Sequence, residues 1–125
     1  MPTESPISRP ILIVEDDEPT QKLLIALLKR SSLTGEIAGD GREAIAMLKT
    51  GDYAAVILDL MMPEISGRDV IHYLSGVDDP VPVVVCSAAG PSALSGFDQR
   101  VVKAVVRKPF DVDQFSDTLF HVARR

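Results

Sequence analysis

Short apolar runs alternate along this chain with longer amphipathic segments. The apolar runs have the length of buried strands, and we expect strands near residues 10–15, 35–39, 54–59, 82–87 and 102–107. Between them, apolar residues recur at helical spacing near residues 18–31, 41–50, from 66 or 67 onward, and 111–123. Continuously apolar strands that alternate with helices are typical of a parallel sheet with crossover helices. The pattern therefore predicts an α/β fold.

The apolar stripes of the expected helices are predicted to face the core. In the first helix, this stripe consists of Leu23, Leu24, Leu27 and Leu28. The last helix follows Asp111, a candidate N-cap. Residues 88–100 differ because Gly90, Pro91 and Gly96 interrupt them, so we expect at most a short or irregular helix there.

The composition fits one globular domain. The 125 residues are 46% hydrophobic and 25% charged, which is enough to build a core. Residues 1–9 contain two prolines and small polar side chains, and we expect them to be a flexible segment before a domain over residues 10–125. No apolar stretch approaches the roughly 20 residues that cross a bilayer, and no signal-peptide core precedes Pro10. We therefore expect a cytoplasmic domain that does not contact a membrane.

Charge and cysteine content narrow the class of partner. The net charge is -5 and the pI is about 4.9, and the basic clusters are only two short pairs, Arg107-Lys108 and Arg124-Arg125. This balance disfavours direct nucleic-acid binding. The single cysteine, Cys86, lies inside an apolar run, so we expect a buried small hydrophobe, compatible with a reducing compartment.

Polar residues stand where several of the expected strands end. Asp59 ends the third apolar run, and packing explains it poorly because unpaired buried charge is costly. Glu15 and Asp16 follow the first run, Ser87 the fourth and Lys108 the last. In an open parallel sheet, ligands bind beyond the carboxyl ends of the strands, where the strand order reverses. We therefore expect these side chains to meet in one pocket.

The carboxylates, lysine and hydroxyl of the expected pocket suit the binding of a metal ion and a phosphoryl group. Several carboxylates repel one another unless a cation neutralises them, and all-oxygen donors suit Mg²⁺. No His or Cys is positioned for zinc. Mg²⁺ also holds phosphate oxygens, to which a lysine offers charge and a hydroxyl offers a hydrogen bond. The pocket is thus suited to phosphoryl transfer onto a carboxylate, with Asp59 as the best candidate nucleophile because it stands alone at its strand end.

The ordered motifs resemble the receiver domain of bacterial two-component response regulators, over about residues 10–123. The motifs are Ile11-Leu12-Ile13-Val14-Glu15-Asp16-Asp17, then Asp59-Leu60-Met61-Met62-Pro63 with Gly67, then Ser87-Ala88, and finally Lys108-Pro109-Phe110. The resemblance implies a flavodoxin-like, doubly wound (βα)5 fold with a parallel five-stranded sheet of order 2-1-3-4-5. It also implies a stand-alone, single-domain member of the family.

The resemblance also implies roles for the acidic residues. Asp59 would accept a phosphoryl group from a phosphohistidine on a sensor histidine kinase or a histidine phosphotransfer protein. Mg²⁺ would be bound by Glu15, Asp16, Asp59 and the backbone carbonyl of Met61. Phosphorylation would add about −1.5 to −2 charge and change the protein-binding surface.

The remaining implied roles and the departures from the family lie in the second half of the chain. Ser87 and Lys108 would contact the phosphoryl oxygens, and the Lys108–Pro109 peptide bond would be cis. Val105 stands where the family usually has Tyr or Phe, so an aromatic rotamer switch coupled to Ser87 is absent. The interrupted stretch 88–100 replaces a regular fourth helix, which puts output through that helix in doubt.

The same residues allow plainer structural interpretations. Glu15 and Asp16 would suit a solvated turn or the N-terminus of a helix. Ser87 alone would suit a cap or turn, and Lys108 alone would suit a surface cation or a structural salt bridge. The joint occurrence of these residues with Asp59 at strand ends favours the site.

Three functions are compatible with these residues. The leading one is a phosphorylation-controlled signalling module, which catalyses only its own phosphoryl transfer and dephosphorylation. An aspartate-nucleophile phosphatase of the haloacid-dehalogenase type normally has a second acid two residues after the nucleophile, where this chain has Met61. A pseudo-receiver would work as an interaction module without phosphorylation, and unchanged partner affinity of Asp59→Asn would support it.

Overall fold

The computed structural model describes residues 7–59, 67–87, 97–108 and 111–124. Within them, five parallel strands form one sheet in the order β2-β1-β3-β4-β5. The strands are β1 (Ile11–Val14), β2 (Gly35–Ala38), β3 (Ala55–Asp59), β4 (Val83–Ser87) and β5 (Val102–Arg107). The helices are α1 (Glu18–Arg30), α2 (Gly41–Thr50), α3 (Gly67–Ser75) and α4 (Val112–Ala123). The predicted flavodoxin-like fold and its strand order are confirmed.

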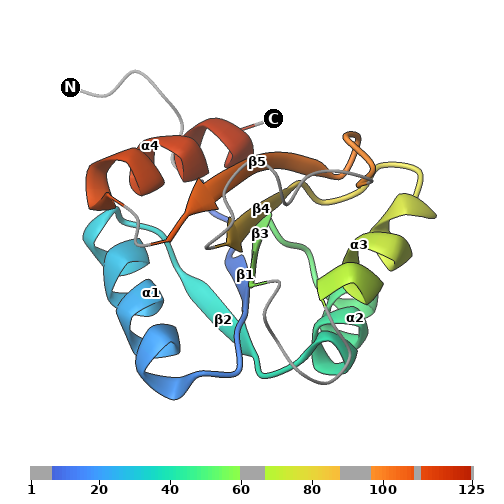
Figure 1. Cartoon of the computed structure of the whole chain (residues 1–125), viewed down its shortest axis with the longest axis horizontal. Helices are drawn as coiled ribbons and strands as arrows, with labels where there is room; N and C mark the ends of the chain where they lie inside the picture. The colour runs from blue at the N-terminus through green and yellow to red at the C-terminus, as the bar shows by residue number, and fades with distance from the viewer. Residues whose placement is uncertain (1–6, 60–66, 88–96, 109–110, 125) are drawn as a thin grey trace.

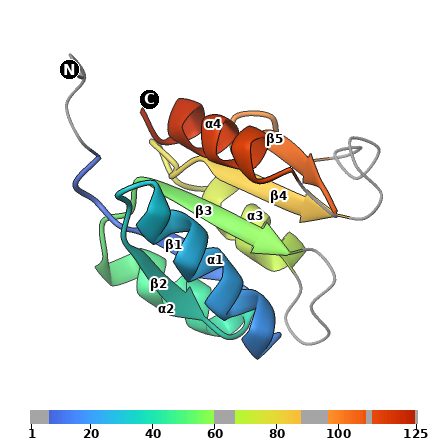
Figure 2. The same ribbon diagram turned by 90° about the vertical axis from the view of Figure 1, so that its left-hand side faces the viewer.

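Helices cover both faces of the sheet. Figure 1 shows α1 and α4 on one side of the strands and α2 and α3 on the other, and Figure 2 shows the same layers from the α1 side. Successive residues of β1 alternate between the two layers, with Ile11 and Ile13 in one apolar cluster and Leu12 and Val14 in the other. Burial of both faces explains why the inner strands β1 and β3 are apolar up to Asp59, whereas the edge strands β2 and β5 carry exposed charged residues.

Aspartate side chains cap three of the helices. Asp17, Asp40 and Asp111 each accept a hydrogen bond from the backbone N–H three residues later, at 3.0, 2.8 and 3.1 Å. A side-chain acceptor at this position satisfies a backbone N–H that has no partner within the helix. The predicted cap at Asp111 is confirmed.

One leucine of α1 does not face the core. Leu24, Leu27 and Leu28 are buried, but Leu23 is 51% exposed. The prediction that Leu23 belongs to the core stripe was therefore wrong. The three buried leucines are spaced as i, i+3 and i+4 and already cover the arc that faces the sheet, whereas Leu23 lies about 100° from Leu24 and about 40° beyond the edge of that arc.

Two predictions fall wholly or partly outside the described residues. Most of the interrupted stretch 88–100 lies there, and its described end forms a turn in which the amides of Val101 and Val102 donate to the carbonyl of Asp98, each at 3.0 Å. Residues 1–6 also lie outside the described part, so the flexible start of the chain remains a prediction. No helix in the described ranges is long and apolar enough to span a bilayer.

Candidate functional site

The sheet topology places the candidate site residues at one edge. Asp59 is the last residue of β3, the central strand, which lies between β1 and β4. Val14 of β1 pairs with Leu58 of β3, so Glu15, the next residue, follows β1 beside Asp59. Lys108 directly follows β5. Because the strands are parallel, all of these residues emerge at their shared carboxyl edge.

Asp59 and Lys108 form an ion pair although they are far apart in the sequence. Lys108 Nζ donates a hydrogen bond to Asp59 Oδ2 at 3.0 Å. The side chain of Asp59 is 10% exposed and that of Lys108 is 29% exposed, so water screens this pair less than it would screen a surface pair. The structure therefore brings together the two residues that the phosphoacceptor hypothesis most requires.

Glu15 is the second carboxyl group of the site. It is 3% exposed, and the backbone N–H of Asp17 donates to its Oε2 at 3.1 Å. Gln21 Nε2 donates to the backbone carbonyl of Glu15 at 2.6 Å, which also fixes this end of β1. Burial, together with the charge and hydrogen bond of neighbouring Asp59, raises the pKa of Glu15 to about 7. Glu15 and Asp59 thus compete for a single ammonium group.

The same environment also raises the pKa of Lys108. Burial alone would lower the pKa of its ammonium, but the hydrogen bond and charge of Asp59, with the charge of Glu15, raise that pKa above its ordinary value. Lys108 therefore stays charged beside the carboxylates. A fixed positive charge at this point suits an incoming phosphoryl group.

The other predicted site residues are placed less completely. Asp16 is exposed just after Glu15, and it makes no hydrogen bond or ion pair with any residue that the structure describes. Ser87 ends β4, one residue beyond Cys86, which pairs with Asp59, so its backbone lies at the same edge. The carbonyl of Met61 and the Lys108–Pro109 peptide bond both involve residues outside the described ranges.

The donor set fits a hard divalent cation such as Mg²⁺. Two neighbouring carboxyl groups face one ammonium, and burial, followed by the charge and hydrogen bond of Asp59, raises the pKa of Glu15. Within the described ranges, no three His, Cys, Asp or Glu side chains gather closely enough to hold a metal. A complete oxygen shell therefore needs backbone carbonyls, residues outside those ranges, or waters, several of which Mg²⁺ normally keeps.

Cys86 lies beside the site but does not belong to its chemistry. It is 2% exposed, and burial is the main cause that raises the pKa of its thiol to about 12. Thiolate is the reactive form, so this cysteine is inert in the folded chain. The prediction of a buried small hydrophobe is confirmed.

The sequence analysis missed the residues that hold Glu15 in place. Asp17 both caps α1 and donates its backbone N–H to Glu15. A signal was present, because an aspartate shortly before a proline and a hydrophobic periodic segment is typical of a helix start. The contact of Gln21 with the carbonyl of Glu15 has no comparable signal in the sequence.

Comparison with known sequences identifies one family. The family model described as the response regulator receiver domain matches residues 11–120. Transcriptional regulatory protein TcrA of Mycobacterium tuberculosis is 34% identical over 117 residues, which cover 92% of this chain and 46% of that protein. Response regulator MprA of Mycolicibacterium vanbaalenii is 36% identical over 117 residues, covering 92% and 50%. The chain spans about half the length of these relatives.

Solved structures agree with these sequence matches. The receiver domain of the Francisella response regulator 1452 superposes with a TM-score of 0.84 at 21% identity, covering 94% of this chain and 98% of that one, and it supports the fold alone. Response regulator protein TrrA of Thermotoga maritima, in complex with Mg²⁺ and BeF, gives a TM-score of 0.81 at 25% identity, covering 91% and 98%.

Proposed function

This chain belongs to the response regulator receiver domain family, and from that membership we propose that it is a phosphorylation-controlled signalling module with Asp59 as phosphoacceptor. The observation that supports this proposal most directly is the 3.0 Å contact of Lys108 Nζ with Asp59 Oδ2, beside buried Glu15. A surface salt bridge needs no second buried carboxyl group beside it. A phosphoacceptor that also holds a cation does need a second carboxyl group nearby.

The proposed reaction transfers a phosphoryl group from nitrogen to oxygen. A carboxylate oxygen of Asp59 attacks the phosphorus of a phosphohistidine, a P–O bond forms, the P–N bond breaks, and the imidazole nitrogen leaves with the bonding electron pair. The ammonium of Lys108 and the hydroxyl of Ser87 would contact the phosphoryl oxygens. Lys108, already paired with Asp59, then exchanges one carboxylate oxygen for the new anionic group.

Mg²⁺ is part of the same proposal. Glu15, Asp16, Asp59 and the backbone carbonyl of Met61 would hold it. When bound, the ion supplies positive charge that both the carboxylates and the phosphoryl oxygens share. The residues of the chain contribute the rest, since Asp17 and Gln21 orient Glu15 and keep its carboxyl next to Asp59.

The proposed partners follow from this chemistry. The donor is a sensor histidine kinase or a histidine phosphotransfer protein, in the cytoplasm, and the product is recognised by a downstream protein. The added charge of about −1.5 to −2 changes the surface that this protein meets. We assign no nucleic-acid or membrane contact to this chain, whose net charge is -5.

Mass spectrometry of the chain after incubation with Mg²⁺ and acetyl phosphate tests the proposal. We expect one added phosphoryl group, and we expect its loss with EDTA or in Asp59→Asn. Asp52→Asn is the matched control, because Asp52 is a surface aspartate with 78% side-chain exposure and pairs only with Arg9 in the described residues. Labelling that persists in Asp59→Asn would refute the assignment.

The competing functions give different results in the same assay. A phosphatase would hydrolyse a phosphomonoester such as p-nitrophenyl phosphate over many turnovers, whereas we expect none. A pseudo-receiver would gain no phosphoryl group under any of these conditions. The second acid of a haloacid-dehalogenase-type phosphatase is replaced in this sequence by Met61, which favours the signalling module.

A further inference from the structure

A pocket separate from the candidate site lies at the end of the sheet opposite Asp59. It has a volume of about 440 Å³, and we call it the basal pocket. Its lining comes from the residues before β4, from the start of β5 and from the last turn of α4, and includes Pro80, Pro82, Arg100, Lys103, His121 and Val122. In parallel strands the starting ends lie at the edge away from the carboxyl ends, so the basal pocket is remote from the candidate phosphorylation site.

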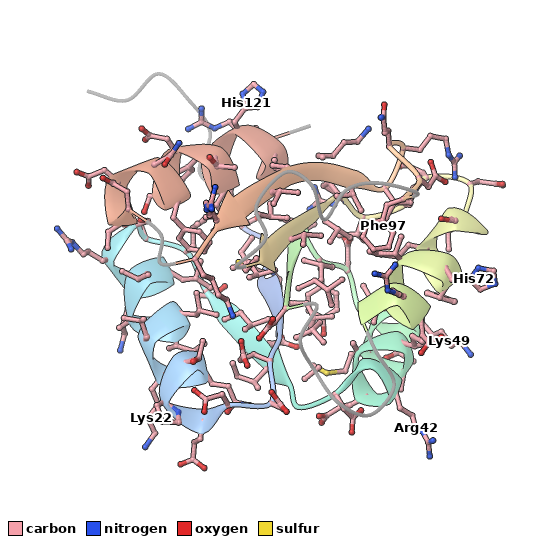
Figure 3. The ribbon with its side chains drawn as sticks, in the orientation of Figure 1. Lys22, Arg42, Lys49, His72, Phe97 and His121 are labelled. Atoms are coloured by element: carbon pink, nitrogen blue, oxygen red, sulfur yellow. The ribbon has the colours of Figure 1, made fainter. Side chains whose placement is uncertain are left out.

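Basic residues from separate elements line the basal pocket. Arg100 Nη2 donates to the backbone carbonyls of Ser75 and Val77 at 3.2 and 3.3 Å, so this side chain is already held in place. Lys103 is exposed and makes no ion pair within the part of the chain that the structure describes. Figure 3 shows His121 on α4, pointing away from the ribbon and on the far side of the molecule from Lys22.

The basal pocket is less acidic than the chain as a whole. Its described lining holds Asp79, Arg100 and Lys103, and Arg100 already has an ion-pair partner in Asp98 at 3.8 Å, so these four charges balance. The chain as a whole has a net charge of -5. An anion that avoids the acidic remainder of the surface therefore meets at the basal pocket a lysine, Lys103, whose charge is not already paired in the described part of the chain.

The basal pocket also has a rigid apolar side. Pro80, Pro82 and Val122 line it, and a proline has neither a backbone N–H to solvate nor a free φ angle. Ligand sites typically combine apolar walls with a few polar groups and enclose roughly 300–1,000 Å³. The basal pocket meets both criteria.

We propose that the basal pocket binds a small organic anion of mononucleotide size. Its phosphate or carboxylate group pairs with Lys103 and Arg100, and its apolar body packs on Pro80, Pro82 and Val122. Lys103 supplies a free charge, whereas Arg100 is preorganised by its contacts with α3. This site is independent of Asp59 and needs no divalent cation.

An NMR titration with adenosine monophosphate in the presence of EDTA tests this proposal. We expect saturable shifts of the backbone amides of Asp79, Lys103, His121 and Val122, with smaller shifts near Lys108. Adenosine, which lacks the anion, and inorganic phosphate, which lacks the apolar body, should each bind at least about threefold more weakly. Either of them binding as tightly as adenosine monophosphate would overturn the proposed pairing of charge and apolar wall.

Variants separate this site from nonspecific attraction. Lys103→Gln should weaken the binding of adenosine monophosphate by about three- to tenfold while leaving the melting temperature unchanged. Lys22→Gln is the matched control, since Lys22 has 78% side-chain exposure on α1 and should bind the probe as the unmodified chain does. Equal affinities of the two variants, or shifts without saturation, would overturn the proposal.

Discussion

Glu15 and Asp16 are neighbours in the sequence but have very different surroundings. Glu15 is 3% exposed and lies beside Asp59, whereas Asp16 is exposed. The difference comes from the register of β1, which carries Glu15 into the sheet edge and turns the next residue outward. A carboxyl group buried next to another one gives up its proton reluctantly, so Glu15 is the residue whose charge depends most on what occupies the site.

The metal-free chain should lose stability as the pH rises from about 4.5 to about 7. The pKa of Glu15 is about 7 in the folded chain against an ordinary value of 4.5, so the folded state binds more protons in this range. The stabilisation is fully present below the ordinary pKa and is lost as the pH rises through the folded pKa. It amounts to at most about 3 kcal/mol. Urea denaturation in EDTA at several pH values measures it.

Glu15→Gln is the control for this pH dependence, because glutamine has a similar shape and no titrating proton. Its free energy of unfolding should vary less between about pH 5 and pH 8 than that of the unmodified chain. Identical slopes for the two proteins would show that Glu15 titrates normally. Carboxyl groups remote from Glu15 contribute equally to both proteins and cancel in the comparison.

Cys86 should resist thiol reagents until the chain unfolds. Its side chain is 2% exposed and burial raises the pKa of its thiol to about 12, so very little thiolate exists near neutral pH. We expect Ellman's reagent to react at least about a hundredfold more slowly with the folded chain than with the chain in guanidinium. Rapid stoichiometric reaction of the folded chain would contradict this account.

At the scale of elements, the turn over residues 97–101 is attached to α3 at two places. The guanidinium carbon of Arg68 lies 4.9 Å from the centre of the Phe97 ring. Arg100 donates to two carbonyl oxygens around the end of α3, and its Nε lies 3.8 Å from Asp98 Oδ2. The chain that follows Asp59 enters α3, and the chain that follows β4 enters this turn. The first described segments after β3 and after β4 therefore contact each other here.

Removing the Arg100 side chain should loosen this attachment. We expect Arg100→Ala to lower the free energy of unfolding by about 1 kcal/mol, because two hydrogen bonds to the helix end are lost from a side chain that is 54% exposed. Arg42→Ala is the control, since Arg42 is an exposed arginine of α2 with no ion pair in the described residues. Thermal denaturation followed by circular dichroism measures both. If Arg100→Ala and Arg42→Ala lost the same free energy of unfolding, the contact of Arg100 with the end of α3 would not stabilise the fold.

The elements differ in how far the sequence predicted them. The inner strands β1 and β3 were predictable because their residues are buried on both faces, which leaves an uninterrupted apolar run. Asp59 and Lys108 were predictable as partners because strand ends in a parallel sheet converge. Leu23 was not, since four leucines within six positions obscure which arc of α1 faces the sheet. The contacts of Arg100 have no sequence signal, because an arginine in a polar turn usually faces solvent.

At the scale of the whole molecule, the parallel sheet keeps the candidate phosphorylation site and the basal pocket at opposite edges. Its carboxyl edge gathers Asp59, Glu15 and Lys108, while the basal pocket lies at the opposite edge. The central strands β1 and β3 each have two neighbours, whereas β5 is an edge strand that pairs only with β4. This pairing has a register irregularity between Val83 and Val84. Lys108 therefore approaches the site from one of the two edge strands of the sheet.

Backbone hydrogen exchange should reflect this difference between strands. We expect the amides of β5 to exchange faster than those of β3, because opening an edge strand breaks one ladder and opening a central strand breaks two. Exchange followed by NMR in the metal-free chain measures the difference. Protection of β5 equal to that of β3 would show that the edge opens only when the whole domain unfolds.

Because Lys108 follows an edge strand, its contact with Asp59 should depend strongly on temperature. Brief peeling of β5 would carry the ammonium away from Asp59 while the remaining sheet stayed intact. The aspartate would then keep its acidic neighbour and lose its counterion. On warming, competence to receive a phosphoryl group should consequently fade at temperatures where circular dichroism still reports a native fold.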